Sequence, residues 1–77
     1  MTVYVEIMLF ATLSRFTPVS ASNYPVASGT TVKNLLNQLN IPEDEVKLVF
    51  VNGIKCDFKF VLKGDERIGI FPAIGGG

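Results

Sequence analysis

The sequence contains no histidine and only one cysteine, Cys56, among its 77 residues. Without histidine, the chain lacks the usual general base, the usual metal ligand and every Ser-His or Cys-His pair. A tetrahedral zinc site would have to combine one thiolate with carboxylates, which is a poor ligand set. We therefore expect no metal site. Because no basic residue lies next to Cys56 in the sequence, we expect a buried strand residue there rather than a thiol that handles sulfur.

A net charge is also absent, because seven Lys and Arg residues cancel seven Asp and Glu residues. With no excess positive charge to attract phosphates, nucleic acid is not expected as a partner. The longest apolar runs, Ile7–Phe10 and Leu48–Val51, are far shorter than the ~20 residues that cross a bilayer. The first residues lack the basic stretch of a signal peptide. We expect no membrane association and a cytoplasmic location, which the lone cysteine also favours.

Neither of the common glycine-rich motifs that cradle phosphate groups occurs. The carboxylates gather in turn-like places, at 43–45 and 65–66, where solvated side chains are the better interpretation than an acid and base pair. A chain of this length has little room to enclose a pocket of ~300 Å³ or more. We expect that the chain is not an enzyme by itself and binds no cofactor.

What the sequence does contain is apolar residues, which make up 48% of the chain against 18% charged residues, and this excludes a disordered segment. The length fits one domain. The clearest helix follows Thr31, which can accept a hydrogen bond from an N–H group at the helix start. After it, Val32, Leu35, Leu36 and Leu39 form one apolar stripe. We expect this helix to be about ten residues long, to end near Asn40 and Pro42, and to pack against a sheet.

Runs rich in β-branched and aromatic residues predict strands at 3–10, 22–27, 46–51, 54–57 and 67–71. Pro25 should place the second strand at an edge, and Asn52-Gly53 predicts a hairpin. Residues 11–16 form a short helical turn in this scheme, and residues 58–63 are either a strand or a loop with buried aromatics. The predicted class is α+β, with one main helix packed on one face of a mixed sheet of four or five strands.

The first and last strands predict an exposed apolar patch. Tyr4, Met8 and Phe10 alternate with an apolar set that points to the core, and Phe71 lies opposite Ile68 and Ile70. A single helix covers only one face of the sheet, so these side chains should stay partly exposed as a docking surface. Phe58 and Phe60 belong either to this patch or to the core.

The end of the chain, Phe71-Pro72-Ala73-Ile74-Gly75-Gly76-Gly77, has an unusual composition. The glycines are compatible with a frayed end. They are also compatible with a segment that enters a channel too narrow for side chains, because glycine has no Cβ. The five residues after Pro72 span at most about 16–18 Å, which is enough to carry a carboxylate into the active site of another protein.

These features resemble the MoaD/ThiS sulfur-carrier family, which has the ubiquitin-like β-grasp fold. The matching segments cover nearly the whole chain: Leu9-Phe10-Ala11 with Leu13-Ser14-Arg15-Phe16, Thr31-Val32 with Leu35-Leu36, Val51-Asn52-Gly53, Leu62-Lys63-Gly64-Asp65-Glu66, and Phe71-Pro72 with Gly75-Gly76-Gly77. The last two of these segments are the most specific when they occur together. The resemblance implies a β-grasp domain over residues 1–72 and a flexible glycine-rich tail over residues 73–77.

The resemblance also implies a carrier cycle. An ATP-dependent activating enzyme of the MoeB/ThiF type adenylates the carboxylate of Gly77, and a sulfur donor converts it to a thiocarboxylate. Gly76 keeps the approach to the channel unobstructed. The expected partner-binding residues are Met8, Phe10, Phe71, Pro72, Ile74 and Gly75.

Within the family, the MoaD branch fits better, because residues 10–16 resemble its short extra helix and Phe71-Pro72 resembles its ending. Ala73 departs from that ending, in which a second proline is common, and the stretch between the helix and Val46 is shorter than in many members. This branch implies sulfur transfer in molybdopterin or tungstopterin synthesis, with a MoaE-like large synthase subunit as partner. The alternatives are a carrier for thiamine or another sulfur metabolite, a ubiquitin-like modifier that forms isopeptide bonds through Gly77, and an interaction module with an inert tail.

Overall fold

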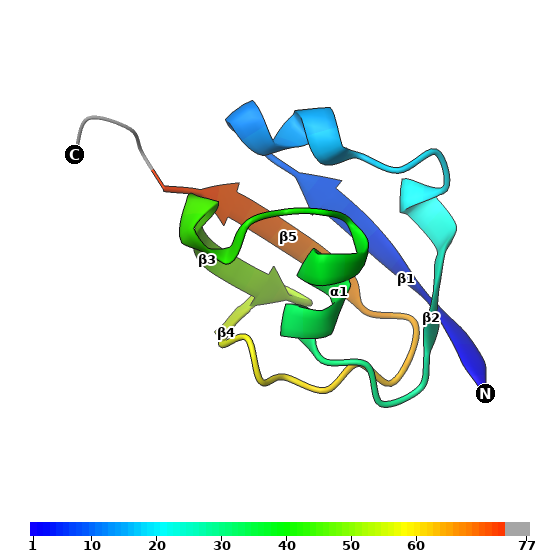
Figure 1. Ribbon diagram of the computed structural model, residues 1–77. Coiled ribbons are helices and arrows are strands. Elements are labelled where there is room, and N and C mark those ends of the chain that lie inside the picture. Colours follow the sequence, from blue (N-terminus) through cyan, green and yellow to red (C-terminus); the bar gives the residue numbers. More distant parts are fainter. Residues whose placement is uncertain (74–77) are drawn as a thin grey trace.

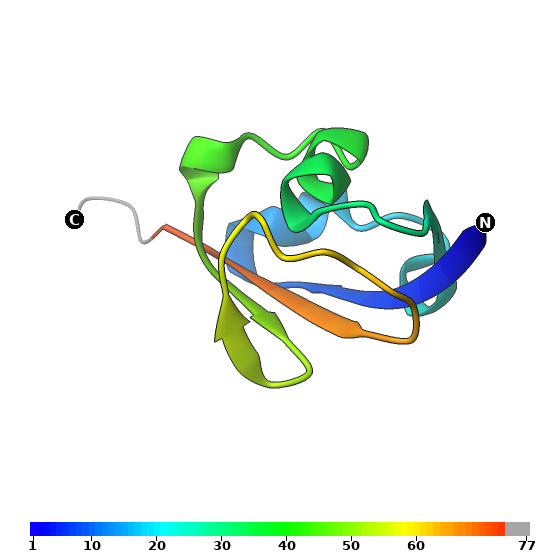
Figure 2. The same ribbon diagram turned by 90° about the horizontal axis from the view of Figure 1, so that it is seen from below.

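In the computed structural model, which describes residues 1–73, a mixed five-stranded sheet carries one α-helix across one face (Figure 1). The strands are β1 (Thr2–Leu9), β2 (Tyr24–Ala27), β3 (Val46–Val51), β4 (Ile54–Cys56) and β5 (Arg67–Pro72), and the helix is α1 (Val32–Gln38). The connections contain 3-10 helices η1 (Ala11–Phe16), η2 (Ala21–Asn23) and η3 (Glu43–Glu45). Seen along the sheet, α1 lies on one side of the strands (Figure 2). The predicted α+β class is confirmed.

The strand order is β2-β1-β5-β3-β4, with β1 and β5 parallel and the other neighbours antiparallel. The first and last strands of the chain therefore lie side by side in the middle of the sheet. Strand β2, which contains Pro25, is at an edge as predicted. Residues 58–63 form a loop with one isolated bridge between Thr31 and Val61. The segment is therefore not a strand, and only one of its two aromatics belongs to the core: Phe58 is partly buried against it, whereas Phe60 is exposed.

Helix α1 begins where the sequence predicts, because the Thr31 hydroxyl accepts a hydrogen bond from the Asn34 N–H at 3.1 Å. The apolar stripe faces the sheet, and Val32, Leu35 and Leu36 are fully buried. The helix has seven residues instead of about ten. It ends early because Asn40 adopts a left-handed conformation with φ of 62°. Within residues 1–73, no helix combines the length and apolar character that a membrane crossing requires.

The turn between Leu62 and Arg67 fixes the start of β5 beside β1. The buried carboxylate of Glu66 accepts hydrogen bonds from the backbone N–H groups of Lys63 and Gly64, both at 2.7 Å. Gly64 has φ of 120°, and a Cβ there would lie 3.0 Å from Cβ of Val3, so the position requires glycine. The Asp65 N–H then donates to the Tyr4 carbonyl at 2.6 Å. The hydrogen bonds of this turn, whose sequence resembles that of the carrier family, thus set the register of the two central strands.

Candidate functional site

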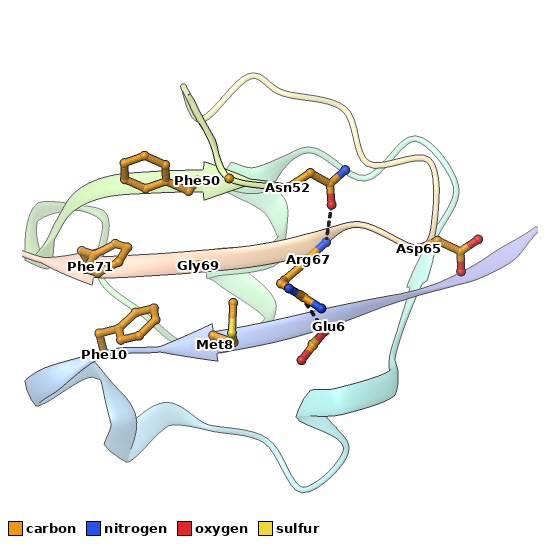
Figure 3. Close-up of a pocket in the computed structure, with 10 residues that line it drawn as sticks. Glu6, Met8, Phe10, Phe50, Asn52, Asp65, Arg67, Gly69 and Phe71 are labelled. Carbon is orange, nitrogen blue, oxygen red and sulfur yellow. Dashed lines mark hydrogen bonds and ion pairs between the residues drawn. The ribbon is translucent and has the colours of Figure 1, made fainter.

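The sheet face opposite α1 carries a cluster of three aromatic rings. Phe10 follows β1, Phe71 lies in β5 and Phe50 lies in β3. The rings of Phe10 and Phe71 are stacked, with centroids 4.3 Å apart and an interplanar angle of 4°. Phe50 meets Phe71 edge to face at 5.7 Å and 77°. Figure 3 shows the three rings together at one end of the face, with Met8 beside Phe10.

The strand period explains why these side chains face away from the core. In β5, Ile68 and Ile70 are fully buried under α1, so Phe71 must point to the opposite face. Phe10, Met8 and Phe71 are brought together as the sequence predicts, and all three remain partly exposed. Phe10 is 38% exposed although its ring stacks on that of Phe71.

Phe50 and Gly69 belong to the same face, although sequence reasoning did not single them out. Each had a signal. Phe50 alternates with the core residues Val49 and Val51, so the period of two already predicts its direction. Gly69 is a glycine inside a strand, a position that often marks the close approach of a ligand or another chain.

An open groove of about 620 Å³ runs along this face (Figure 3). In the strand register, Gly69 pairs with Met8 on one side and with Phe50 on the other, so the floor of the groove has no side chain between them. The expectation that the chain is too short to enclose such a volume concerned internal pockets, and this groove lies on the surface. We call it the sheet groove; its lining residues are Glu6, Met8, Phe10, Phe50, Asn52, Gly53, Asp65, Arg67, Gly69 and Phe71.

The end of the sheet groove away from the aromatic cluster is polar. Nε of Arg67 lies 3.1 Å from Oε1 of Glu6, and both side chains are well exposed to solvent. The Asn52 side-chain oxygen accepts a hydrogen bond from the Arg67 backbone N–H at 2.9 Å. Asp65 lines the same end and has no ion-pair partner among residues 1–73. The groove is therefore apolar at one end and charged at the other.

Strand β5 leads out of the aromatic cluster toward the end of the chain. Pro72 pairs with Val46 in the sheet, and the Ala73 N–H donates to the Glu45 carbonyl at 2.9 Å. Pro72 follows Phe71 in β5 and is half-buried. The predicted site residues Ile74, Gly75, Gly76 and Gly77 lie outside the described residues.

Residues 1–73 contain no group of three or more His, Cys, Asp or Glu side chains arranged to hold a metal ion. Cys56 lies in β4 and is half-buried, so it is less buried than the sequence predicts. Burial and the neighbouring Asp57 raise the pKa of the Cys56 thiol, which lowers its nucleophilic thiolate fraction at neutral pH.

Comparisons with known proteins match this geometry. The model of the ThiS family matches residues 7–77. Among solved structures, the HVO 2177 protein of Haloferax volcanii is similar with a TM-score of 0.76 and 22% identity, over 99% of this chain and 88% of that chain. A putative molybdopterin converting factor, subunit 1, from Pyrococcus furiosus is similar with a TM-score of 0.68 and 19% identity, over 94% and 99%.

Small archaeal modifier protein 1 from Methanosarcina acetivorans is similar with a TM-score of 0.67 and 22% identity, over 100% of this chain and 99% of that chain. At these identities the likeness shows the fold, which is the ubiquitin-like β-grasp. No curated protein matches the chain in sequence.

Proposed function

The chain belongs to the ThiS family, and from that premise we propose that it is a sulfur carrier whose working group is the carboxylate of Gly77. The observation that carries the proposal is that the aromatic cluster and the glycine-rich end belong to one continuous segment of the chain. The family match extends through residue 77, and β5 leads from the aromatic cluster directly toward that glycine-rich end. A protein that docks on the sheet groove would therefore also be near the glycine carboxylate.

The proposed cycle has two steps. The carboxylate oxygen of Gly77 attacks the α-phosphorus of ATP on an activating enzyme, which releases pyrophosphate and leaves an acyl-adenylate. A sulfide-equivalent nucleophile then adds to the carbonyl carbon, and AMP leaves with the former carboxylate oxygen. The product is a thiocarboxylate, and the second step involves no net oxidation or reduction. Adenylation is needed because a free carboxylate is a poor electrophile, whereas AMP is a good leaving group.

In this cycle the chain itself is a carrier and not an enzyme. ATP binding and catalysis belong to a MoeB/ThiF-like adenylyltransferase, and we propose that Met8, Phe10, Phe71 and Pro72 dock that enzyme. Ala73 is hydrogen-bonded to Glu45, and a chain of four residues, the length of 74–77, spans at most about 13–14 Å. We propose that Ile74, Gly75 and Gly76 pass through a narrow channel over this distance. The cytoplasm is the proposed compartment, because the first step consumes ATP.

For the sulfur acceptor we propose the molybdopterin or tungstopterin branch, with a MoaE-like large synthase subunit as the second partner. Two observations support it. The 3-10 helix η1 follows β1 directly, as in the short extra helix of that branch. The similar protein from Pyrococcus furiosus is described as a putative molybdopterin converting factor subunit.

A second candidate function is that of a ubiquitin-like modifier that joins target lysines through Gly77. It is favoured by the likeness to proteins described as small archaeal modifier protein 1. Lysine adducts of the Gly77 carboxylate in cell extracts would support this candidate, whereas co-purification with a large synthase subunit would support the pterin branch. A ThiS-like carrier for thiamine or another sulfur metabolite would co-purify with the acceptor enzyme of that pathway instead.

The test is ATP–pyrophosphate exchange with the cognate activating enzyme. Deletion of Gly77 shortens the reach by about 3.3–3.6 Å, and a displacement of ~1 Å can already cost ~100-fold in rate. Gly76→Val places a branched side chain in the proposed channel. Both variants should lose exchange yet unfold at the wild-type temperature, because the changes lie beyond β5. Ala27→Val, which enlarges an exposed residue of β2, is the matched control and should exchange normally.

Exchange at the wild-type rate by either tail variant would show that the glycine end is not the working end. A wild-type protein that supports no exchange with any activating enzyme of its own cell would contradict the carrier proposal as a whole.

A further inference from the structure

A second groove lies at the β4 edge of the sheet and shares no lining residue with the sheet groove. It arises because β4 pairs only with Val49–Val51, so the first half of β3, residues Val46–Leu48, has no strand beside it on that side. After β4 the chain leaves the sheet and runs toward the start of α1 (Figure 1), where the Phe58 carbonyl accepts the Lys33 N–H at 3.0 Å. The space between β3 and this departing segment is an open groove of about 390 Å³, which we call the edge groove.

The edge groove has an apolar floor and a basic rim. The floor belongs to the core, because Val49 is fully buried and both Cys56 and Phe58 pack against the buried cluster. In the rim, three lysines against one aspartate leave an excess of two positive charges. The aspartate, Asp57, is partly engaged, since its Oδ1 accepts the Lys59 N–H at 2.8 Å. The lining residues are Lys47, Leu48, Val49, Lys55, Cys56, Asp57, Phe58 and Lys59.

This excess of charge is local, because the chain as a whole is neutral. Three of the seven basic residues form ion pairs with glutamates, namely Arg15, Lys33 and Arg67. The other four are lysines without an ion-pair partner among residues 1–73, and all of them except Lys63 line the edge groove. The unpaired positive charge of the described chain is therefore concentrated around one apolar opening.

The open edge of β3 favours an extended peptide over a small anion. A free strand edge can hydrogen-bond to an added extended segment, and pockets beside it receive alternate side chains of that segment. Lys47 lies where the pairing of β3 with β5 shifts register, and a lysine at a bulge keeps strands from adding to an edge indiscriminately. A segment that is admitted here has to bring negative charge for the lysines and an apolar side chain for the floor.

We propose that the edge groove binds an extended acidic segment of a partner protein, with one apolar side chain against Cys56 and Phe58 and carboxylates beside Lys47 and Lys59. The two grooves share no lining residue, so this segment and a protein on the sheet groove contact different side chains. The chain thereby has a second binding site, which does not depend on the chemistry of Gly77.

The probe is a synthetic peptide in which one leucine stands between pairs of glutamates, with both ends blocked. In an NMR titration of the isotope-labelled full chain, the amide signals of residues 47–49 and 55–59 should shift, whereas those of Met8 and Gly69 in the sheet groove should not. The peptide should also slow the alkylation of Cys56, whose side chain lines the edge groove. A peptide with serine in place of the leucine should bind roughly tenfold more weakly, because it buries no apolar side chain.

Charge reversal tests the basic rim. Lys47→Glu and Lys59→Glu should each weaken peptide binding roughly three- to tenfold at low salt, because each replaces the attraction of an exposed ion pair with a repulsion, and the effect should shrink as salt increases. Lys63→Glu is the matched control. It makes the same change of charge at the exposed lysine outside the edge groove and should change the affinity by less than about twofold.

Four results would overturn the proposal. Absence of the expected shifts at millimolar peptide would mean that the groove binds no such segment. Equal weakening by Lys63→Glu and the two groove variants would reduce the binding to general charge attraction, and equal affinity for the leucine and serine peptides would reduce it to anion binding. A concentration-dependent dimer of the wild-type protein in sedimentation experiments, abolished by Lys59→Glu, would assign the groove to a second copy of the chain.

Discussion

Glu66 offers the sharpest test of how the fold supports the sheet groove. Its carboxylate is buried, and each of its two oxygens accepts one backbone N–H, from Lys63 and from Gly64, at 2.7 Å. Glu66→Gln keeps the size of the side chain but replaces one acceptor oxygen with an NH₂ group, which would then face a backbone donor. One charge-assisted hydrogen bond is lost, and the other becomes neutral.

The magnitude follows from those contacts. A hydrogen bond to a charged group contributes about 1.5–3 kcal/mol, so we expect Glu66→Gln to lower the free energy of unfolding by about that amount. A small domain has only ~5–15 kcal/mol in total, so the loss is large. The neighbouring Asp65→Asn is the matched control. Asp65 is exposed with φ of 66°, a conformation that asparagine adopts readily, and we expect a change within ~0.5 kcal/mol.

Urea unfolding of the three proteins measures both values, and equal slopes would allow the midpoints to be compared directly. A Glu66→Gln protein as stable as Asp65→Asn would refute the reasoning, because the turn would then hold β5 beside β1 without its carboxylate.

Two further predictions concern the core and the cysteine. Leu36→Ala should cost about 2–5 kcal/mol in urea unfolding, because Leu36 is fully buried on the face of α1 that packs against the sheet. Asn37→Ala, on the exposed side of the helix, should change stability by less than ~0.5 kcal/mol; similar losses for both would contradict the amphipathic assignment. Since burial and Asp57 raise the pKa of the Cys56 thiol, its alkylation at pH 7 should be slower than that of free cysteine and should accelerate as pH rises into the alkaline range; a faster reaction at pH 7 would contradict this.

The fold was largely predictable because its signals are local. Thr31 caps α1, the apolar stripe of that helix faces the core, and Asn52-Gly53 joins β3 to β4. The end of α1 was predicted less well. Asn40 takes the left-handed conformation and the Ile41 N–H bonds back to the Leu36 carbonyl at 2.9 Å, which stops the helix earlier than the apolar period alone indicates.

The candidate site was predictable only in part, because it depends on pairings between distant strands. Alternation in the sequence gives the direction of Phe10 and Phe71, but only the parallel pairing of β1 with β5 stacks their rings. Phe50 joins them because β3 lies on the other side of β5. The groove over Gly69 exists only when all three strands are assembled, so no single segment of the sequence reveals it.

The central claim is that Gly77 carries sulfur, and intact-mass spectrometry of the protein purified from its native cells tests it most directly. The expected result is a species heavier than the carboxylate form by the difference between one sulfur and one oxygen atom, with the added mass located in the peptide that ends at Gly77. The variant that lacks Gly77, expressed in the same cells, should show only the carboxylate mass. A wild-type protein that remains a carboxylate at Gly77 in cells that contain the activating enzyme and the sulfur donor would contradict the account.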